Sequence, residues 1–166
     1  MFHVVLYQPE IPPNTGNIMR LCANTGCRMH LIHPLGFHLD DRRLRRAGLD
    51  YREWVTVQHH ETLGACRTAL QGARLFAFST HGRSIYSDAT FLPGDAFLFG
   101  PETRGLPAAL LDRVEPSHVL RLPMVGECRS LNLANAVAVV VYEAWRQQHF
   151  SGADPLPRTS RASAPG

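Results

Sequence analysis

Short apolar segments alternate with helical patterns along most of this 166-residue chain. The strand candidates are residues 2–8, 27–34, 74–80, 95–100 and 118–124. The helix candidates are residues 14–26, 61–72, 107–114 and 130–148. Strands that alternate with helices predict an α/β domain whose sheet is mostly parallel and flanked by helices. Ligands of such sheets bind beyond the carboxyl ends of the strands, so the loops that follow the strands are the first places to search.

The ends of the helices carry recognisable residues. Asn14 or Thr15 is expected to cap the first helix after the Pro-rich loop 9–17, and Gly26 to end it in the left-handed conformation. Residues 40–48 predict a short helix or turn, and residues 54–58 a short strand. The last helix is apolar around most of its circumference, so it needs cover on more than one side. A second copy of the chain is the expected cover, which predicts a homodimer through this helix.

The length of the chain suits one domain with a sizeable core. We expect residues 1–150 to form that domain and the Pro-, Ser-, Gly- and Ala-rich residues 151–166 to be a disordered tail. No apolar run approaches the roughly 20 residues that a membrane helix needs. The N-terminus shows neither the basic region nor the cleavage site of a signal peptide, so the expected location is the cytoplasm.

All 17 basic residues are arginine, and the net charge is +3. The absence of lysine excludes a Schiff-base lysine, a lysine general base and a P-loop lysine. Arginine suits phosphate, so a nucleic-acid partner remains possible. The densest cluster is Arg42, Arg43, Arg45 and Arg46. It is consistent with phosphate contacts, and equally with a solvated helix face paired with neighbouring aspartates.

No metal site is expected. The four cysteines form no CxxC pair, and in a cytoplasmic chain they are expected to be reduced thiols. One group of candidate ligands lies within twelve residues, but its spacing, C-x4-C-x2-H-x2-H, matches no established zinc pattern. That group is Cys22, Cys27, His30 and His33. The adjacent His59 and His60 are interpreted as surface residues.

The segment FGPETRGLP, residues 99–107, interrupts a predicted strand abruptly. Gly100 and Pro101 end the apolar run, two opposite charges follow, and Gly105 and Pro107 close the bend. Ligand-binding loops have this composition more often than ordinary surface turns. The segments FSTHG (78–82) and LPMVGECRS (122–130) leave two other strands in the same way.

Three segments together resemble the SPOUT class of RNA methyltransferases. They are EIPPNTGNIMRLCANTG (10–26), FLFGPETRGLP (97–107) and LRLPMVGECRSLNLANAVAVVVYEAWRQ (120–147). The resemblance is strongest to the TrmL or YibK type, the tRNA (cytidine/uridine-2′-O-)-methyltransferases that modify the wobble nucleotide, and DDRRLRRAGLDY (40–51) is also similar to that type. It covers about residues 2–148. It implies a trefoil knot near the C-terminus, S-adenosylmethionine as cofactor, and the last helix in a dimer interface.

The resemblance also implies residue roles. Gly100 would allow close approach to the cofactor, Gly105 would supply an unusual φ, and Asn135 would be a buried polar group that ties the knot together. The implied cofactor-binding residues are Phe78, Gly100, Glu102, Gly105, Leu122, Met124, Ser130, Leu131 and Asn135. The implied catalytic residues are Arg20, Asn14, Ser130, Asn132 and Tyr142.

Several of these roles have structural alternatives. Arg20 would stabilise a developing alkoxide or a phosphate, because arginine is always protonated, but it could also form a structural ion pair. Ser130 could simply cap the last helix, and Tyr142 could simply pack in an interface. Arg42, Arg43, Arg45, Arg46 and Arg129 are the implied RNA contacts.

The implied reaction is 2′-O-methylation of the wobble cytidine or uridine, position 34, in the anticodon arm of tRNA, with tRNA-Leu isoacceptors as the expected substrates. A related enzyme that acts on another tRNA position or on ribosomal RNA is the main alternative. A non-catalytic RNA-binding dimer is disfavoured because Asn14, Arg20, Glu102, Ser130 and Asn132 occur together. A Rossmann-type nucleotide-binding protein is disfavoured because no G-x-G-x-x-G follows the first strand.

Overall fold

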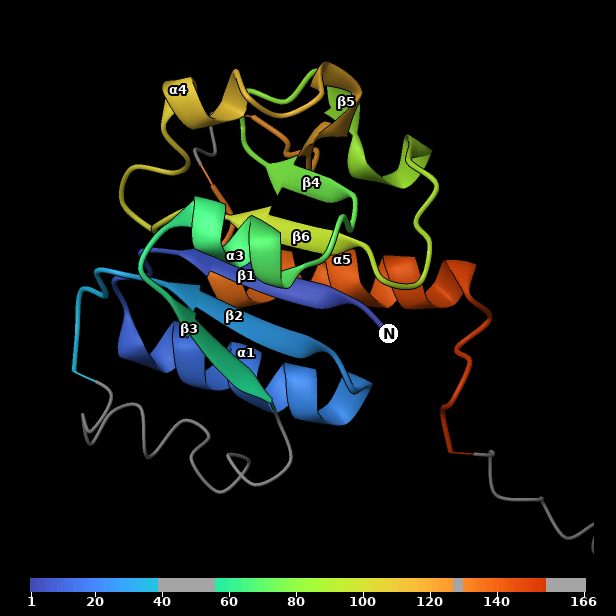
Figure 1. The fold of residues 1–166 in the computed structure, drawn as a ribbon. Coiled ribbons are helices and arrows are strands. Elements are labelled where there is room, and N and C mark those ends of the chain that lie inside the picture. The colour runs from blue at the N-terminus through green and yellow to red at the C-terminus, as the bar shows by residue number, and fades with distance from the viewer. Residues whose placement is uncertain (39–55, 127–129, 155–166) are drawn as a thin grey trace, which may run out of the picture.

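A single parallel sheet organises the chain (Figure 1). The computed structural model describes residues 1–38, 56–126 and 130–154, and seven strands of these ranges pair in the order β3-β2-β1-β6-β4-β7-β5. Every pairing between them is parallel, which confirms the predicted α/β class. The strands are β1 (His3–Tyr7), β2 (Arg28–Ile32), β3 (Val57–His60), β4 (Leu75–Phe78), β5 (Ser84–Ile85), β6 (Ala96–Phe99) and β7 (Val119–Arg121).

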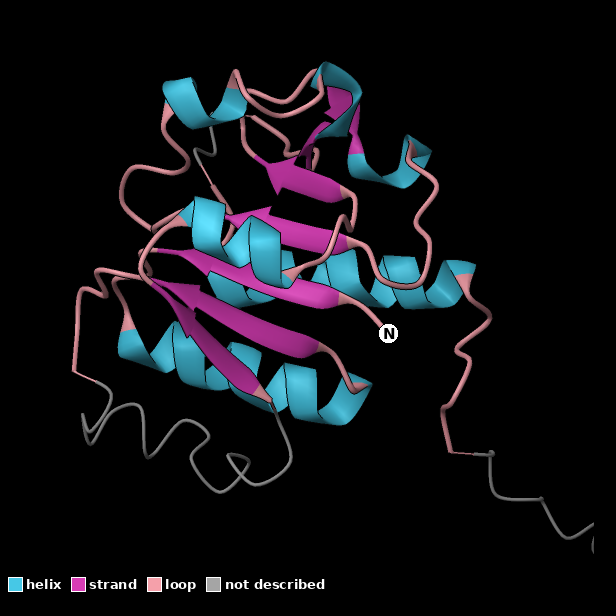
Figure 2. Cartoon of the chain, viewed as in Figure 1, coloured by secondary structure: helices cyan, strands magenta, loops and turns pink. Residues whose placement is uncertain are grey.

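Helices cover both faces of the sheet (Figure 2). Helices α1 (Pro12–Thr25) and α5 (Leu133–Gln147) lie on one face, and α3 (Leu63–Ala69) lies on the other (Figure 1). The shorter elements are α4 (Ala108–Leu111) and the 3-10 turns Tyr86–Asp88 and Pro116–His118. Successive side chains of a strand point to opposite faces, so each face has its own apolar core. Val4 and Val5, neighbours in β1, illustrate this: Val4 packs in the α1/α5 core and Val5 in the α3 core.

Helix α1 begins before the residues expected to cap it. Pro12 is its first residue and Ile11 is the N-cap. No capping side chain is required, because Pro12 and Pro13 have no N–H and the N–H groups of Asn14 and Thr15 donate to the Ile11 carbonyl. The prediction that Asn14 or Thr15 caps this helix is therefore wrong: both are buried inside its first turn. The C-terminal prediction is confirmed, since Gly26 ends the helix with φ of 67°.

Helix α5, in contrast to α1, begins later than predicted. Its N-cap is Asn132, whose side chain accepts hydrogen bonds from the backbone N–H groups of Ala134 and Asn135. Ser130 is therefore not the cap. The helix buries Val137, Val140, Val141 and two further residues against the sheet and α1, as the apolar pattern requires.

The opposite side of α5 is not covered by any of the described residues. Val139 is 39% exposed and Tyr142 is 47% exposed. The four valines of this helix thus divide between the core and the surface. Among the described residues, no helix combines the length and apolar character that crossing a membrane would require.

Candidate active site

The loops that follow β4, β6 and β7 meet in one cavity of about 470 Å³. This cavity lies at the carboxyl ends of the parallel strands, where ligands of such sheets bind. The start of α1 and the start of α5 complete its wall. The sequence analysis expected these three loops to share a site, and the structure brings them together. Besides the predicted residues named below, the wall includes Ser79, Thr80, His81, Thr103 and Arg104.

The bend after β6 folds tightly on itself at Gly100. A Cβ atom at this position would lie 2.4 Å from the Gly105 carbonyl carbon and 2.4 Å from the Leu106 nitrogen, closer than real contacts allow. Gly105 has φ of 65°, and its N–H donates to the Pro101 carbonyl at 2.9 Å. Gly105 therefore has the unusual φ that was expected. The close approach at Gly100, however, is to the loop's own backbone.

Glu102 fixes the segment that leads into helix α1. Its carboxylate accepts hydrogen bonds from the backbone N–H of Glu10 at 2.8 Å and of Ile11 at 3.2 Å. It also accepts one from Nδ2 of Asn14 at 3.1 Å. A negative charge at a helix N-terminus is favourable because the free N–H groups there carry partial positive charge. Glu102 is thus engaged mainly with the start of α1.

Asn14 continues this chain of hydrogen bonds to the last helix. Its Oδ1 accepts from Nδ2 of Asn132 at 2.9 Å, and Asn132 Oδ1 caps α5. Each amide therefore uses both of its ends, with its donor toward one neighbour and its acceptor toward the other. Glu102, Asn14 and Asn132 come from the three segments that the sequence analysis singled out, and one network joins them.

A second set of contacts clamps the same two loops together. Glu10 Oε2 accepts from the Thr103 N–H at 3.0 Å and from the Thr103 hydroxyl at 2.7 Å. The hydrogen bonds from Thr103 lower the pKa of the Glu10 carboxyl. Arg104 donates through Nη2 to Gln8 Oε1 at 2.9 Å. Nothing in the sequence pairs these residues, which lie more than 90 positions apart.

Most of the predicted site residues line the cavity. They are Asn14, Phe78, Gly100, Glu102, Gly105, Leu122, Met124, Ser130, Leu131 and Asn132. Three predicted residues do not line it. Asn135 is exposed on α5, which contradicts its expected burial, and Arg20 and Tyr142 lie on exposed sides of α1 and α5. The five arginines proposed as RNA contacts, Arg42, Arg43, Arg45, Arg46 and Arg129, lie outside the described residues.

A sequence profile of the SpoU rRNA Methylase family matches residues 1–142. This chain belongs to the SpoU methylase family. The cavity therefore lies in a methyltransferase fold, as the three sequence segments indicated.

Relatives of the chain within the SpoU family are similar over nearly its whole length. A tRNA (cytidine(34)-2′-O)-methyltransferase of Methylovorus glucosotrophus is 60% identical over 153 residues, which cover 92% of this chain and 99% of that protein. The protein of the same name from Escherichia coli K12 is 56% identical over 153 residues, with coverage of 92% and 98%.

Solved structures of SpoU-type enzymes have the same architecture. One, described as "Structural insights into the 2-OH methylation of C/U34 on tRNA", superposes with a TM-score of 0.85 at 51% identity, covering 90% of this chain and 97% of that one. The SpoU methyltransferase AviRb from Streptomyces viridochromogenes, in complex with AdoMet, superposes with a TM-score of 0.79 at 25% identity. The match covers 91% of this chain and 58% of AviRb.

The residues present fit a nucleoside cofactor of this kind. The cavity volume is within the range of about 300–1,000 Å³ that is typical of small-molecule sites. The same wall offers apolar surface for an adenine ring and a methionine chain, from Phe78, Leu122, Met124 and Leu131. Polar side chains beside them, such as Asn14, Ser130 and Asn132, can fix the orientation of such a ligand.

Proposed function

We propose that this chain transfers a methyl group from S-adenosylmethionine to the ribose 2′-hydroxyl of nucleotide 34, a cytidine or uridine, in tRNA. The observation that carries the proposal is the 60% identity, over nearly the full length of both chains, with a tRNA (cytidine(34)-2′-O)-methyltransferase. The cavity at the strand ends gives the reaction a location. We expect the substrates to include tRNA-Leu isoacceptors, recognised through the anticodon arm in the cytoplasm.

The cavity residues would hold the cofactor. The backbones of Phe78, Gly100, Leu122, Met124, Ser130 and Leu131 would bind its adenine, ribose and methionine parts. When bound, S-adenosylmethionine supplies a methyl group on a positively charged sulfur, an electrophile that requires no metal. Gly105 and Glu102 would act through the shape of their loop, since the Glu102 carboxylate already accepts from three donors. Asn135, exposed on α5, would contribute only at the edge of this site.

The remaining task is to orient the ribose hydroxyl, whose oxygen gains the methyl carbon and whose proton leaves. Holding the two reacting atoms in line can lower the barrier by about 7–11 kcal/mol at best. Asn14, Ser130 and Asn132 lie on the cavity wall and would position the ribose. Arg20 would stabilise the developing alkoxide or the adjacent phosphate, because a guanidinium stays charged.

A second copy of the chain would complete the site. Arg20 and Tyr142 lie on exposed sides of two helices that pack against each other, α1 and α5. A homodimer formed through α5 would cover Val139 and Tyr142 and bring both predicted catalytic side chains into an interface next to a cavity.

Five arginines would contact the phosphates of the anticodon arm: Arg42, Arg43, Arg45, Arg46 and Arg129. Phosphate contacts of this kind orient a protein on nucleic acid.

The trefoil knot is also part of this proposal. Strand β7 lies between β4 and β5 in the sheet, so the connection from β4 to β5 must pass β7 beside the site. The Ser79 N–H at its start continues the β4–β7 pairing and donates to the Leu120 carbonyl at 2.9 Å. A Cβ atom at Gly82 would lie 2.6 Å from the Leu120 carbonyl carbon. A chain that threads past β7 here requires a residue without a side chain, and a knot would supply such a crossing.

The test is transfer of labelled methyl groups from S-adenosylmethionine to total tRNA and, in a parallel assay, to ribosomal RNA, followed by nuclease mapping of the product. Label on the ribose of nucleotide 34 is the expected result. Label only at another tRNA position or in ribosomal RNA would replace this substrate with the main alternative. Absence of transfer, together with no cofactor binding by calorimetry, would overturn the assignment as a methyltransferase.

A further inference from the structure

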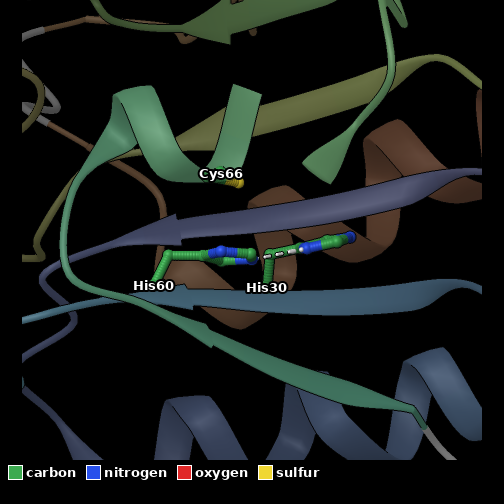
Figure 3. Close-up of side chains that lie close together, drawn as sticks. All are labelled: His30, His60 and Cys66. Atoms are coloured by element: carbon green, nitrogen blue, oxygen red, sulfur yellow. Dashed lines mark hydrogen bonds between the residues drawn. The ribbon is translucent and has the colours of Figure 1, made fainter. Parts of the chain in front are cut away.

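Three side chains with metal-binding atoms converge beneath helix α3, on the sheet face opposite α1 and α5 (Figure 3). His30 comes from β2, His60 from β3 and Cys66 from α3. Because Ile32 pairs with His60 in the register of the two strands, His60 lies one side-chain repeat further along the same face than His30. The rings of His30 and His60 therefore lie on the same face of the sheet and approach each other under helix α3.

The three ligand atoms are already close together. His30 Nδ1 and His60 Nε2 are 3.0 Å apart, and all three atoms lie within 4.8 Å of one another. Metal–nitrogen bonds of about 2.0 Å in a trigonal or tetrahedral arrangement hold two nitrogens about 3.3–3.5 Å apart, so the rings need move only a few tenths of an ångström. A metal–sulfur bond of about 2.3 Å would draw the sulfur about 1.2 Å closer at most.

Burial and a hydrogen bond from His30 to His3 favour metal binding by these residues. Cys66 is fully buried, His30 is 1% exposed and His60 is 9% exposed, so water competes little for a bound ion. His30 Nε2 lies 2.9 Å from His3 Nδ1. With its proton on Nε2, His30 donates to His3 and presents the lone pair of Nδ1 to the cluster. A hydrogen bond from the second ring nitrogen is the usual means of orienting a metal-binding histidine.

We propose that His30, His60 and Cys66 form a buried three-ligand site for a soft transition-metal ion, with monovalent copper as the best match. Two imidazoles and one thiolate are a set that suits copper. A closed zinc site uses four ligands, and within the described ranges no fourth histidine, cysteine or carboxylate joins the group. This proposal departs from the expectation from sequence that the chain has no metal site. Of the group of candidate ligands considered there, only His30 belongs to this cluster.

Binding is balanced by the loss of one proton. The Cys66 thiol releases its proton to solvent as the sulfur–metal bond forms. The proton between His30 Nδ1 and His60 Nε2 moves to His60 Nδ1, so both nitrogens become free to bind.

The bound ion would link β2, β3 and α3. Strands β2 and β3 lie on either side of residues 39–55 in the sequence, and these residues include four of the proposed RNA-binding arginines. This inference does not depend on the proposed methyl transfer.

The test titrates the metal-free full-length chain with Cu(I) under anaerobic conditions against a competing chelator. The wild type should retain one copper per chain. Two matched pairs of variants locate the ion: His60→Gln against His59→Gln, and Cys66→Ala against Cys22→Ala. Since loss of outer-shell partners alone weakens metal binding by about 10–100-fold, His60→Gln and Cys66→Ala should weaken it by at least about 100-fold. The variants at His59 and Cys22 should bind like the wild type.

X-ray absorption of the copper-loaded wild type gives a measurement that does not rely on any variant folding. One sulfur and two nitrogen ligands are expected. Copper with nitrogen and oxygen ligands only would overturn the proposal, as would failure to retain copper against the chelator. Loss of binding in His59→Gln but not in His60→Gln would also overturn it, since this would assign the ion to the exposed pair His33 and His59, whose ring nitrogens are 3.0 Å apart.

Discussion

Glu102 shows how a residue implied to bind a cofactor can first be a structural residue. Its carboxylate, 91 positions away from Ile11, accepts from the backbone N–H of Ile11, the residue that precedes helix α1, and so fixes the entry to that helix. Because the same carboxylate orients the Asn14 amide, its position also determines how Asn14 faces the cavity. Stability and catalysis should therefore both respond to this one charge.

Replacement of Glu102 by glutamine should lower both the stability of the fold and the rate of methyl transfer. The amide keeps one acceptor but loses the charge and directs an N–H₂ group toward existing donors. Hydrogen bonds to charged groups contribute about 1.5–3 kcal/mol, so we expect the free energy of unfolding in urea to fall by a similar amount. Methyl transfer should fall with it. Glu10→Gln, which keeps an acceptor for Thr103 in hydrogen bonds that are exposed to solvent, is the control. Equal losses in the two variants would contradict a special role of Glu102 at the start of α1.

Gly100→Ala tests whether the bend after β6 needs a glycine where it packs against its own backbone. The added Cβ atom meets backbone 2.4 Å away, which cannot move aside as a side chain would. Overpacking of this kind costs about 1–3 kcal/mol, and the displaced loop should also weaken binding of S-adenosylmethionine in calorimetry. Gly64→Ala is the matched control, because its Cβ would have an ordinary contact of 3.7 Å inside α3. If Gly100→Ala binds the cofactor like the wild type, the bend does not need a glycine there.

Arg20→Ala separates a catalytic role from a structural one. Arg20 is exposed and does not line the cavity of its own chain, so its loss should leave cofactor affinity intact. Removal of a group that stabilises developing negative charge costs about 100–1,000-fold in turnover, and we expect a loss of that size in methyl transfer to tRNA. Arg67→Ala on the opposite sheet face is the control. Unfolding of the Arg20 variant, or loss of its cofactor binding, would assign this arginine a structural role.

At the level of elements, periodicity located the interiors of the strands and helices better than their ends. The buried strands β1, β2, β4 and β6 lie inside the predicted segments, because a run of apolar residues is itself the signal. The start of α1 was misplaced because the helix begins on Pro12 and Pro13, which favour the first turn, so the usual capping residues Asn14 and Thr15 were misleading. Strand β5 has only two residues and leaves no periodic pattern.

The starts of β4 and β6 are joined by a nearly buried carboxylate. Asp95, 3% exposed, accepts from Arg74 Nε at 2.9 Å and Nη2 at 2.6 Å, and also from the Leu92 N–H at 2.7 Å. Asp95→Asn removes the charge and leaves at least one of these donors unpaired. Breaking a buried pair costs about 3–5 kcal/mol, and because the Arg74 side chain is 38% exposed we expect about 2–3 kcal/mol in urea unfolding. Asp88→Asn, at an exposed position, should leave the free energy of unfolding close to that of the wild type. An equally small change in Asp95→Asn would show that the ion pair of Arg74 and Asp95 is not important for stability.

At the level of the whole molecule, sequence identified the loops of the site but not the contacts that hold them. FGPETRGLP was recognisable from its composition alone, and its neighbours in space were expected from the rule for parallel sheets. The links from Glu102 to Asn14 and from Asn14 to Asn132 could not be predicted, since side chains so far apart in the chain leave no spacing to measure. The same holds for His60, which was interpreted as a surface residue and is buried beside His30.

The dimer is the prediction that depends on the whole molecule. Val139 is 39% exposed on the side of α5 that no other described element covers. If a second copy covers it, Val139→Glu should place a charge in the interface and convert the wild-type dimer to a monomer in sedimentation velocity. Leu92→Glu, a similar change at an apolar residue that is 50% exposed elsewhere, should leave the dimer intact. A monomeric wild type, or a dimer that tolerates Val139→Glu, would contradict this interface.

The bond between Asn14 and Asn132 spans 118 positions of the chain. During synthesis the first helix therefore emerges from the ribosome long before its partner exists, and the pocket wall is incomplete until the final helix has arrived. Contacts between such distant positions are slow to form because a long loop must close first. A nascent chain that ends before residue 132 should consequently be unable to retain a nucleoside, even if most of its sheet has already assembled.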